Sequence, residues 1–227
     1  MYHTNMDSAR VFNDAEEEMH RVFNPEHSPF YGPVFRYFPT QLVTYNQQRE
    51  YFQLQGCVPS APEVPRPANS TLALYIHGAC HNEGRSVARA AYSVLFGPNS
   101  RYNTSELLEP TISQTKTRAE IESLSKALQI IGHISEENIS VQHVKLATDS
   151  EYLVNAFGVP MHKRMHKKEL RPNGDNCQHY QLLKHMSDEM DDLEYISGGG
   201  ITCQMWHVPL HQNRAAAELA NLALNGA

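Results

Sequence analysis

The alternation of strand-like and helix-like segments after residue 71 most constrains how this chain can fold. Five β-rich segments are predicted, at 71–80, 88–98, 107–114, 139–150 and 201–210. Helical patterns cover 117–132, 150–158, 176–190 and 213–226, and Gly132 is expected to end the first of them. This order predicts an α/β domain with a mixed five-stranded sheet flanked by helices.

The first 70 residues have a different character, with eight of the thirteen prolines and no lysine. Apolar residues at helical spacing predict a helix from Ser8 to Phe23, ended by Pro25. An extended arm rich in aromatic residues and proline follows. We therefore divide the chain into helix and arm at 1–56, a proline-rich linker at 57–70 and the α/β domain at 71–227.

The arm admits three interpretations. It packs its aromatic side chains on the domain behind it, or it associates with a second copy of the chain or another protein partner. The third interpretation is disorder, which so many aromatic residues disfavour.

Composition and charge exclude several classes of protein. No apolar run in the 227 residues approaches the roughly 18 needed to span a bilayer, so no membrane partner is expected. The acidic stretch near the N-terminus is unlike a secretory signal or a mitochondrial presequence, which predicts a cytoplasmic or nuclear location. The four cysteines are widely spaced and are expected to be free thiols. The net charge of -6 counts against nucleic acid as a partner unless positive charge is local.

Four short motifs follow one another in the second part of the chain. They are LYIHGAC at 74–80, TKTRAEIESLSKAL at 115–128, LATDSEYLV at 146–154 and NRAAAELANLAL at 213–224. In this order, and on these predicted elements, they resemble the type 1 ribonuclease H family. The spelling GACHNEG and the Trp-x-Val-Pro before the last helix are most similar to fungal members. The resemblance implies a ribonuclease H-like fold.

The resemblance also implies a chemistry. The family hydrolyses RNA paired with DNA by using two divalent ions held by four acids, so Mg²⁺ or Mn²⁺ is implied if this chain is active, and no cofactor otherwise. Glu120 and Asp149 stand at the second and third acid positions, whereas His77 stands at the first and Ala217 at the fourth. Each missing carboxylate removes an attraction of roughly 4 kcal/mol per unit of ion charge at about 4 Å. A degenerate active site follows.

Two histidines leave alternatives open. His77 is either a remnant at the end of a strand or, with Glu120 and Asp149, a ligand of a single transition metal, which imidazole suits better than it suits Mg²⁺. His211 precedes the last helix, where the family often has a histidine that transfers protons. That role stays open too, because the sequence here is PLHQN rather than a glycine-rich loop.

The residues implied to contact nucleic acid fall into two sets. Six correspond to positions that read 2′-hydroxyls in the minor groove of a hybrid: Cys80, His81, Asn82, Thr115, Lys116 and Thr117. The second set is a basic run where some family members grip DNA: Lys163, Arg164, Lys167, Lys168 and Arg171. This run contacts phosphates, is only solvated, or serves as a nuclear-import signal.

Three functions are compatible with these features. The leading one is a ribonuclease H-like domain that binds RNA/DNA hybrid, or another nucleic acid, and is catalytically impaired. The second is a metal-dependent hybrid endoribonuclease. The third is a scaffold that uses the fold and the N-terminal arm for homodimer or hetero-association.

Overall fold

The computed structural model describes residues 21–28, 30–58, 61–137, 140–158, 179–196 and 200–226. Its centre is a mixed sheet in which five neighbouring strands run in the order β6, β5, β4, β7 and β8. Their bounds are β4 Thr71–His81, β5 Arg89–Leu95, β6 Thr104–Leu107, β7 His143–Thr148 and β8 Thr202–His207. β4, β5 and β6 are antiparallel neighbours, whereas β4, β7 and β8 run parallel. The predicted mixed α/β sheet is confirmed.

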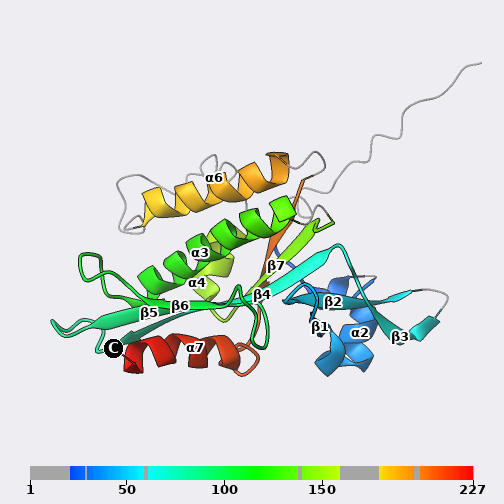
Figure 1. The fold of residues 1–227 in the computed structure, drawn as a ribbon, viewed down its shortest axis with the longest axis horizontal. Coiled ribbons are helices and arrows are strands. Elements are labelled where there is room, and N and C mark those ends of the chain that lie inside the picture. The colour runs from blue at the N-terminus through cyan, green and yellow to red at the C-terminus, as the bar shows by residue number, and fades with distance from the viewer. Residues whose placement is uncertain are drawn as a thin grey trace, which may run out of the picture.

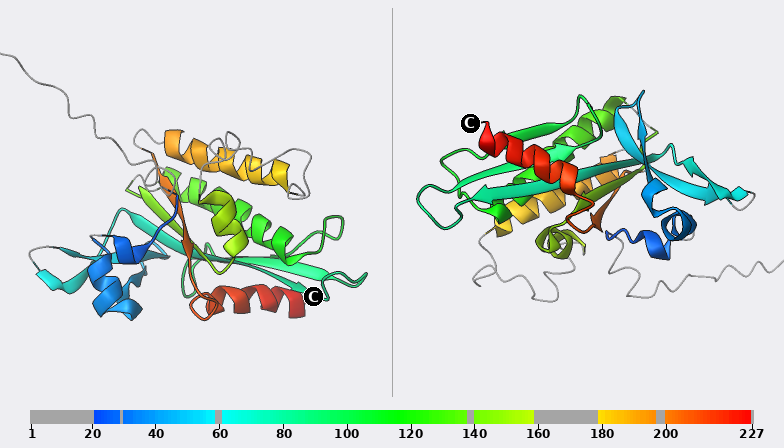
Figure 2. Two further views of the ribbon diagram at one scale, coloured as in Figure 1. Left: turned by 180° about the vertical axis from the view of Figure 1, so that it is seen from behind. Right: turned by 90° about the horizontal axis from the view of Figure 1, so that it is seen from below.

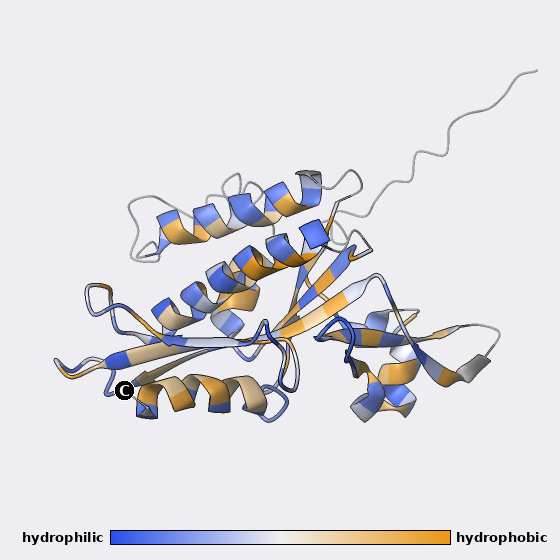
Figure 3. Cartoon of the chain, viewed as in Figure 1, coloured by the Kyte–Doolittle hydropathy of each residue, from blue (hydrophilic) through white to orange (hydrophobic). Residues whose placement is uncertain are grey.

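Helices cover both faces of this sheet. α3 (Lys116–Glu137), α4 (Glu151–Phe157) and α6 (Tyr180–Ile196) lie on one side, and α7 (Arg214–Asn225) lies on the other (Figure 1). Apolar and polar residues alternate around α3, α6 and α7 (Figure 3), as expected for helices with one face on a core. The largest buried cluster lies between α3 and the sheet and includes Leu74, Ile76, Leu124 and Leu146.

None of the described helices is long and apolar enough to cross a membrane.

Several predicted boundaries differ from the structure, among them the end of α6 at Ile196 rather than 190, and two of the differences have a clear physical reason. The third strand is Thr104–Leu107 rather than 107–114. Pro110 has no N–H for a ladder, and the side chain of Gln114 instead accepts a hydrogen bond from the Ala90 N–H at 2.9 Å. α3 also continues past Gly132 to Glu137. It does so because Ile134 extends the buried face and Gly132 faces open space.

The sheet has eight strands rather than five, because the N-terminal part of the chain joins it. β1 (Val43–Asn46) pairs with β2 (Tyr51–Val58), and β2 pairs with β3 (Ala61–Pro67). β2 also pairs with β4 at Phe52 and Ala73. The segment 57–70, predicted as a linker, therefore contains the end of β2 and all of β3. Its prolines favour extended backbone, and that backbone is used in a hairpin.

The arm before β1 is built of short helical turns instead of the extended backbone that we predicted. They are η1 (Pro25–His27), α2 (Gly32–Tyr37) and η2 (Pro39–Gln41). Each has a proline at its first or second position, where the fixed φ of proline suits a helix and its missing N–H costs nothing.

These turns pack on the same face of the sheet as α7, at its other end. Val34, Leu42 and Leu54 are buried there against Ala147 and Trp206 of the sheet. The described part of the arm thus packs on its own chain, and together with β1–β3 we call residues 21–67 the N-terminal module. Its strand β2 also supplies Tyr51 to the main core.

Residues 21–23 lie along β8 at the edge of the sheet. Phe23 donates its N–H to the Met205 carbonyl at 2.8 Å, and Met205 donates to the Arg21 carbonyl at 2.7 Å (Figure 2). The side chain of Arg21 is buried and pairs with Asp191 and Glu194 of α6. The predicted helix from Ser8 to Phe23 therefore does not include these three residues, and the rest of it lies outside the described residues.

Lys145 of β7 is buried where this module meets the sheet, which yields a testable prediction. Its ammonium group donates to Gln204 and lies 4.9 Å from the centre of the Phe23 ring. Burial lowers the pKa of Lys145 from 10.5 to about 8. The unfolded chain therefore binds more protons between those values, and this residue makes the fold more stable as pH rises from about 8.

Lys145→Met is expected to stabilise the protein near neutral pH, by up to about 3 kcal/mol for a shift of this size. The gain over wild type should shrink as pH rises above 8, because the cost of the buried charge in wild type then disappears. Thermal unfolding of both proteins across this range measures the difference. Lys184→Met, which removes the charge of a half-exposed lysine of α6 paired with Asp188, is the control. A constant difference at all pH values would contradict the prediction.

Candidate functional site

The candidate site lies where β4 and β7 separate. These parallel strands pair from Thr71 to Tyr75 on β4 and from His143 to Ala147 on β7. His77 and Asp149 follow just beyond the last pair, so the ends of the two strands bring them together. Ligand sites in open α/β sheets commonly form outside the carboxyl ends of parallel strands.

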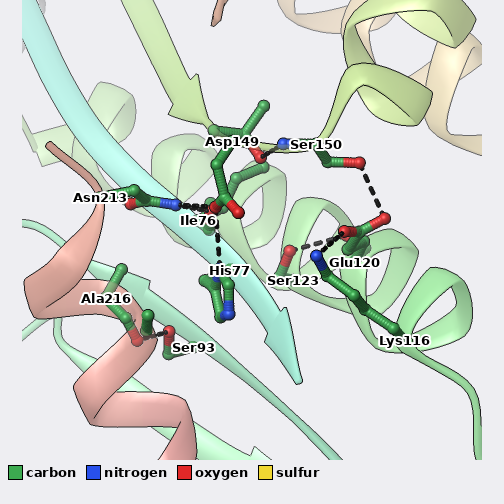
Figure 4. A network of polar contacts seen from close by, with 12 residues as sticks. Ile76, His77, Ser93, Lys116, Glu120, Ser123, Asp149, Ser150, Asn213 and Ala216 are labelled. Carbon is green, nitrogen blue, oxygen red and sulfur yellow. Dashed lines mark hydrogen bonds and ion pairs between the residues drawn. The ribbon is translucent and has the colours of Figure 1, made fainter. Parts of the chain in front are cut away.

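Asp149 is held by donors from two other elements. His77 Nδ1 lies 2.8 Å from Asp149 Oδ1, and the Asn213 side-chain amide donates to the same oxygen at 2.5 Å (Figure 4). Asn213 also donates to the Ile76 carbonyl at 3.0 Å. Partial burial disfavours the charged form of Asp149, but the hydrogen bonds from His77 and Asn213 outweigh it and lower its pKa to about 2. Asp149 is therefore a carboxylate whose charge is already stabilised by the protein.

The Asn213 amide has one defined orientation, because both of its NH₂ contacts are acceptors. Its side-chain oxygen is buried and has no hydrogen-bond partner among the described residues. Asn213 immediately precedes α7 but its side chain does not cap that helix. The residue is therefore used to hold Asp149 and β4 rather than to begin the helix.

Glu120 reaches the site from α3. A Cβ on Gly78 of β4 would lie 2.4 Å from the Glu120 backbone nitrogen, so glycine is required for this close approach of strand and helix. Glu120 accepts a hydrogen bond from the Ser150 hydroxyl at 2.7 Å, and Lys116 Nζ lies 3.5 Å from its other oxygen. Burial raises the pKa of Glu120 and the charge of Asp149 adds to this rise, whereas Ser150 and Lys116 oppose it. Both oxygens of Glu120 therefore also contact donor groups of the protein.

The structure thus places two hydrogen-bonded groups side by side, as Figure 4 shows. His77 contacts Asp149, and Glu120 is bonded to Ser150, the residue after Asp149. Ala217 lies on α7 one turn after Asn213 and adds no polar group. His211 is exposed on the loop between β8 and α7.

The donor set does not fit the two divalent ions that the resemblance implied. Two carboxylates remain, and each already accepts hydrogen bonds from side chains of the protein. His77 directs Nδ1 at Asp149 rather than at a shared position between the acids. Within the described ranges, no group of three or more His, Cys, Asp or Glu side chains is placed to hold a metal ion. Hard divalent ions need several free oxygen ligands, which this network does not offer.

The six predicted minor-groove residues also lie together. Cys80, His81 and Asn82 end β4 and begin its loop, and Thr115, Lys116 and Thr117 begin α3. The loop is held to the helix because the Lys116 N–H donates to Glu83 at 3.1 Å and the Cys80 thiol donates to the Gln114 carbonyl at 3.3 Å. Asn82 has a φ of 53°, a left-handed conformation that asparagine tolerates. The basic run from Lys163 to Arg171 lies outside the described residues.

Sequence reasoning missed three residues of this site. The sequence could have indicated Asn213 and Ser150, because both stand in the quoted motifs directly before a helix. Side chains of this kind often make local hydrogen bonds there. Glu83, which holds the start of α3, had none, because its partner is a backbone N–H more than thirty positions away.

Comparisons with known proteins bear on the family and the fold of this chain. The sequence model of the RNase H family matches residues 69–224. The chain is similar to LC11-RNase H1, isolated from compost by a metagenomic approach, with a TM-score of 0.47 and 17% identity over 69% of this chain and 97% of that one.

Two further structures are similar in fold. A foamy viral protease-reverse transcriptase in complex with dsDNA has a TM-score of 0.50 and 17% identity over 68% of this chain and 94% of that one. RNase H1 from the halophilic archaeon Halobacterium salinarum has a TM-score of 0.40 and 20% identity over 69% and 99%. No curated protein matches the chain.

Proposed function

The chain belongs to the RNase H family, and from this premise we propose that it binds RNA/DNA hybrid without cleaving it by the two-metal route. The loop after β4 and the start of α3 form the binding surface for the hybrid. The basic run from Lys163 to Arg171 supplies phosphate contacts.

One observation carries this proposal. Each remaining carboxylate is paired within the protein, Asp149 with His77 and Asn213, and Glu120 with Ser150 and Lys116. These donors stabilise the two carboxylates within the protein, and the Lys116 ammonium group also counters the charge of Glu120. Binding should not need a divalent ion to neutralise the site.

The minor-groove surface supports hybrid as the ligand. RNA strands are told from DNA by contacts to the 2′-hydroxyl, which both donates and accepts hydrogen bonds. The six residues at the end of β4, in the loop that follows and at the start of α3 offer thiol, imidazole, amide, hydroxyl and ammonium groups. Hydrogen bonds hold this loop to the start of the helix.

The two alternatives have less support. A Mn²⁺-dependent endoribonuclease would have only two acids and, because His77 Nδ1 is paired with Asp149, only the Nε2 atom of His77 as a further ligand. An association through the N-terminal arm would compete with the contacts that Val34 and Leu42 already make within this chain.

We expect labelled hybrid to bind with equal affinity in EDTA and in Mg²⁺ at matched ionic strength, and to stay intact in Mg²⁺ and in Mn²⁺. Replacing Lys163, Arg164, Lys167 and Lys168 by alanine should weaken binding for all sequences. The logarithm of the binding constant falls linearly with the logarithm of the salt concentration. The magnitude of this slope should decrease by about one for each phosphate that the variant no longer neutralises. Lys184→Ala, which removes a half-exposed lysine of α6, is the control. Anisotropy and gel analysis of the same samples read both properties.

Binding that requires Mg²⁺, or cleavage that Asp149→Asn abolishes, would overturn the proposal in favour of an active metalloenzyme. Absence of any hybrid binding would favour the scaffold.

A further inference from the structure

A cavity of about 300 Å³ lies at the seam between the N-terminal module and the end of β8. Pro25 and Phe35 line it from the module, and Trp206, His207, Pro209 and Gln212 line it from β8 and the loop that follows. The residues matched by the family model begin at 69, so half of this cavity is built by a part of the chain that the family domain does not include.

The lining of the cavity and the candidate site are adjacent along two elements. His207 is paired in register with Thr148, the residue before Asp149, and the Val208 N–H donates to the Thr148 carbonyl at 3.0 Å. Gln212 immediately precedes Asn213, whose amide holds Asp149. The cavity and the candidate site therefore both lie at the carboxyl ends of the neighbouring parallel strands β7 and β8.

Its chemistry is that of a site for a flat, uncharged heterocycle. Trp206 and Phe23 form a rigid wall, with ring centres 5.5 Å apart at an interplanar angle of 83° and exposed fractions of only 5% and 7%. Pro25, Pro209 and Phe35 add apolar surface, and the polar residues His207 and Gln212 are exposed where they line the cavity. None of the cavity's described lining residues is acidic. Apolar walls with a few convergent polar groups at a seam between structural units are typical of ligand sites.

We propose that this cavity binds one unpaired nucleobase of a strand whose neighbouring phosphate lies at the Asp149 site. The inference rests on the proposed binding of nucleic acid and extends it to strands with a single-stranded end or an unstacked base. Proteins recognise unpaired bases by apolar or aromatic contact together with hydrogen bonds to the base edge. Here Trp206, Phe23 and the prolines supply the apolar contact, and His207 with Gln212 supply the hydrogen bonds.

Trp206 is the only tryptophan of the chain and lines the cavity, so its fluorescence reports on binding there without a signal from another tryptophan. Adenosine and cytidine monophosphates should change it saturably, whereas ribose 5-phosphate, which has no base, should not. A hybrid with an unpaired overhang should bind about tenfold more tightly than the same hybrid with blunt ends, the effect of one held base. The double variant His207→Ala with Gln212→Ala should lose this advantage and keep its affinity for blunt hybrid. Both side chains are exposed, so the fold should be unaffected.

Leu210→Ala is the matched control, since Leu210 is exposed on the same loop but does not line the cavity. Blunt hybrid that binds without any overhang advantage or fluorescence change would overturn the cavity proposal and leave the proposed function standing. A base-dependent fluorescence change without hybrid binding would support the cavity and reject the proposed function. An overhang advantage that survives the double variant would place the base elsewhere and overturn the proposal.

Discussion

A chain that begins at Asn69 is expected to lose its cooperative unfolding transition, although it contains the whole segment that the family model matches. The deletion removes Val34, Leu42 and Leu54, which are 0–3% exposed. Burial of each such side chain contributes roughly 1.5–3 kcal/mol. Together they approach the roughly 5–15 kcal/mol of total stability that is usual for a domain. Tyr51 is removed from the main core as well.

The deletion also uncovers apolar surface that the module covers, including Tyr75, Ala147 and Trp206. Calorimetry should show no transition, and binding of a hydrophobic dye should show a gain in fluorescence. A chain lacking residues 1–18 is the control, because it keeps Arg21 and the described contacts of the module. If the chain from Asn69 unfolds cooperatively near the wild-type temperature, the module is an independent attachment and the boundary predicted near residue 70 stands.

The double variant His77→Asp with Ala217→Asp should gain a response to Mg²⁺ that we do not expect of the wild type. His77→Asp replaces a donor 2.8 Å from Asp149 by a like charge. Two unit charges about 4 Å apart repel by roughly 4 kcal/mol at an effective dielectric of 20, so the metal-free variant should be less stable. Four carboxylates would then face one another, which is the donor set that hard divalent ions require.

Mg²⁺ at about a hundred times its dissociation constant should stabilise this variant by about 2.7 kcal/mol. That corresponds to roughly 5–11 °C in melting temperature for a chain of this size. Thermal unfolding with and without Mg²⁺ measures it, and cleavage of labelled hybrid shows whether activity returns. The variant His77→Asn with Ala217→Asn has similar side-chain shapes without the charges, and it should not respond. An equal response in wild type would mean that the network of His77, Asp149 and Asn213 opens readily to hold metal. A folded double aspartate variant that binds Mg²⁺ and stays inert would mean that the groove has diverged too.

These two experiments separate the roles of the two parts of the molecule. The first tests whether the N-terminal module is needed for the fold. The second tests whether aspartates at positions 77 and 217 are enough to turn the hydrogen-bonded site at Asp149 into one that binds Mg²⁺.

The sequence alone determined the elements of residues 71–227 and the neighbourhood of Glu120 and Asp149. Strands and helices follow from local periodicity, and the buried face of α3 at Ile121, Leu124 and Leu128 was readable in that way. The positions of His77 and Ala217 could also be predicted from local patterns, because the motifs place them at the end of a strand and on the last helix.

The tertiary structure alone decided how remote segments use one another. Arg21 pairs with Asp191 across 170 positions, and no periodicity of either segment predicts that contact. The prolines of the first 70 residues were compatible with an extended arm, a linker or helical turns. Only the burial of Val34 and Leu54 against the sheet decided among these structures. In the same way the acids of the motifs indicated a metal site, whereas the donors that close on Asp149 come from β4 and from the loop before α7. Hydrogen bonds and apolar burial between distant segments depend on three-dimensional proximity, which local sequence patterns do not encode.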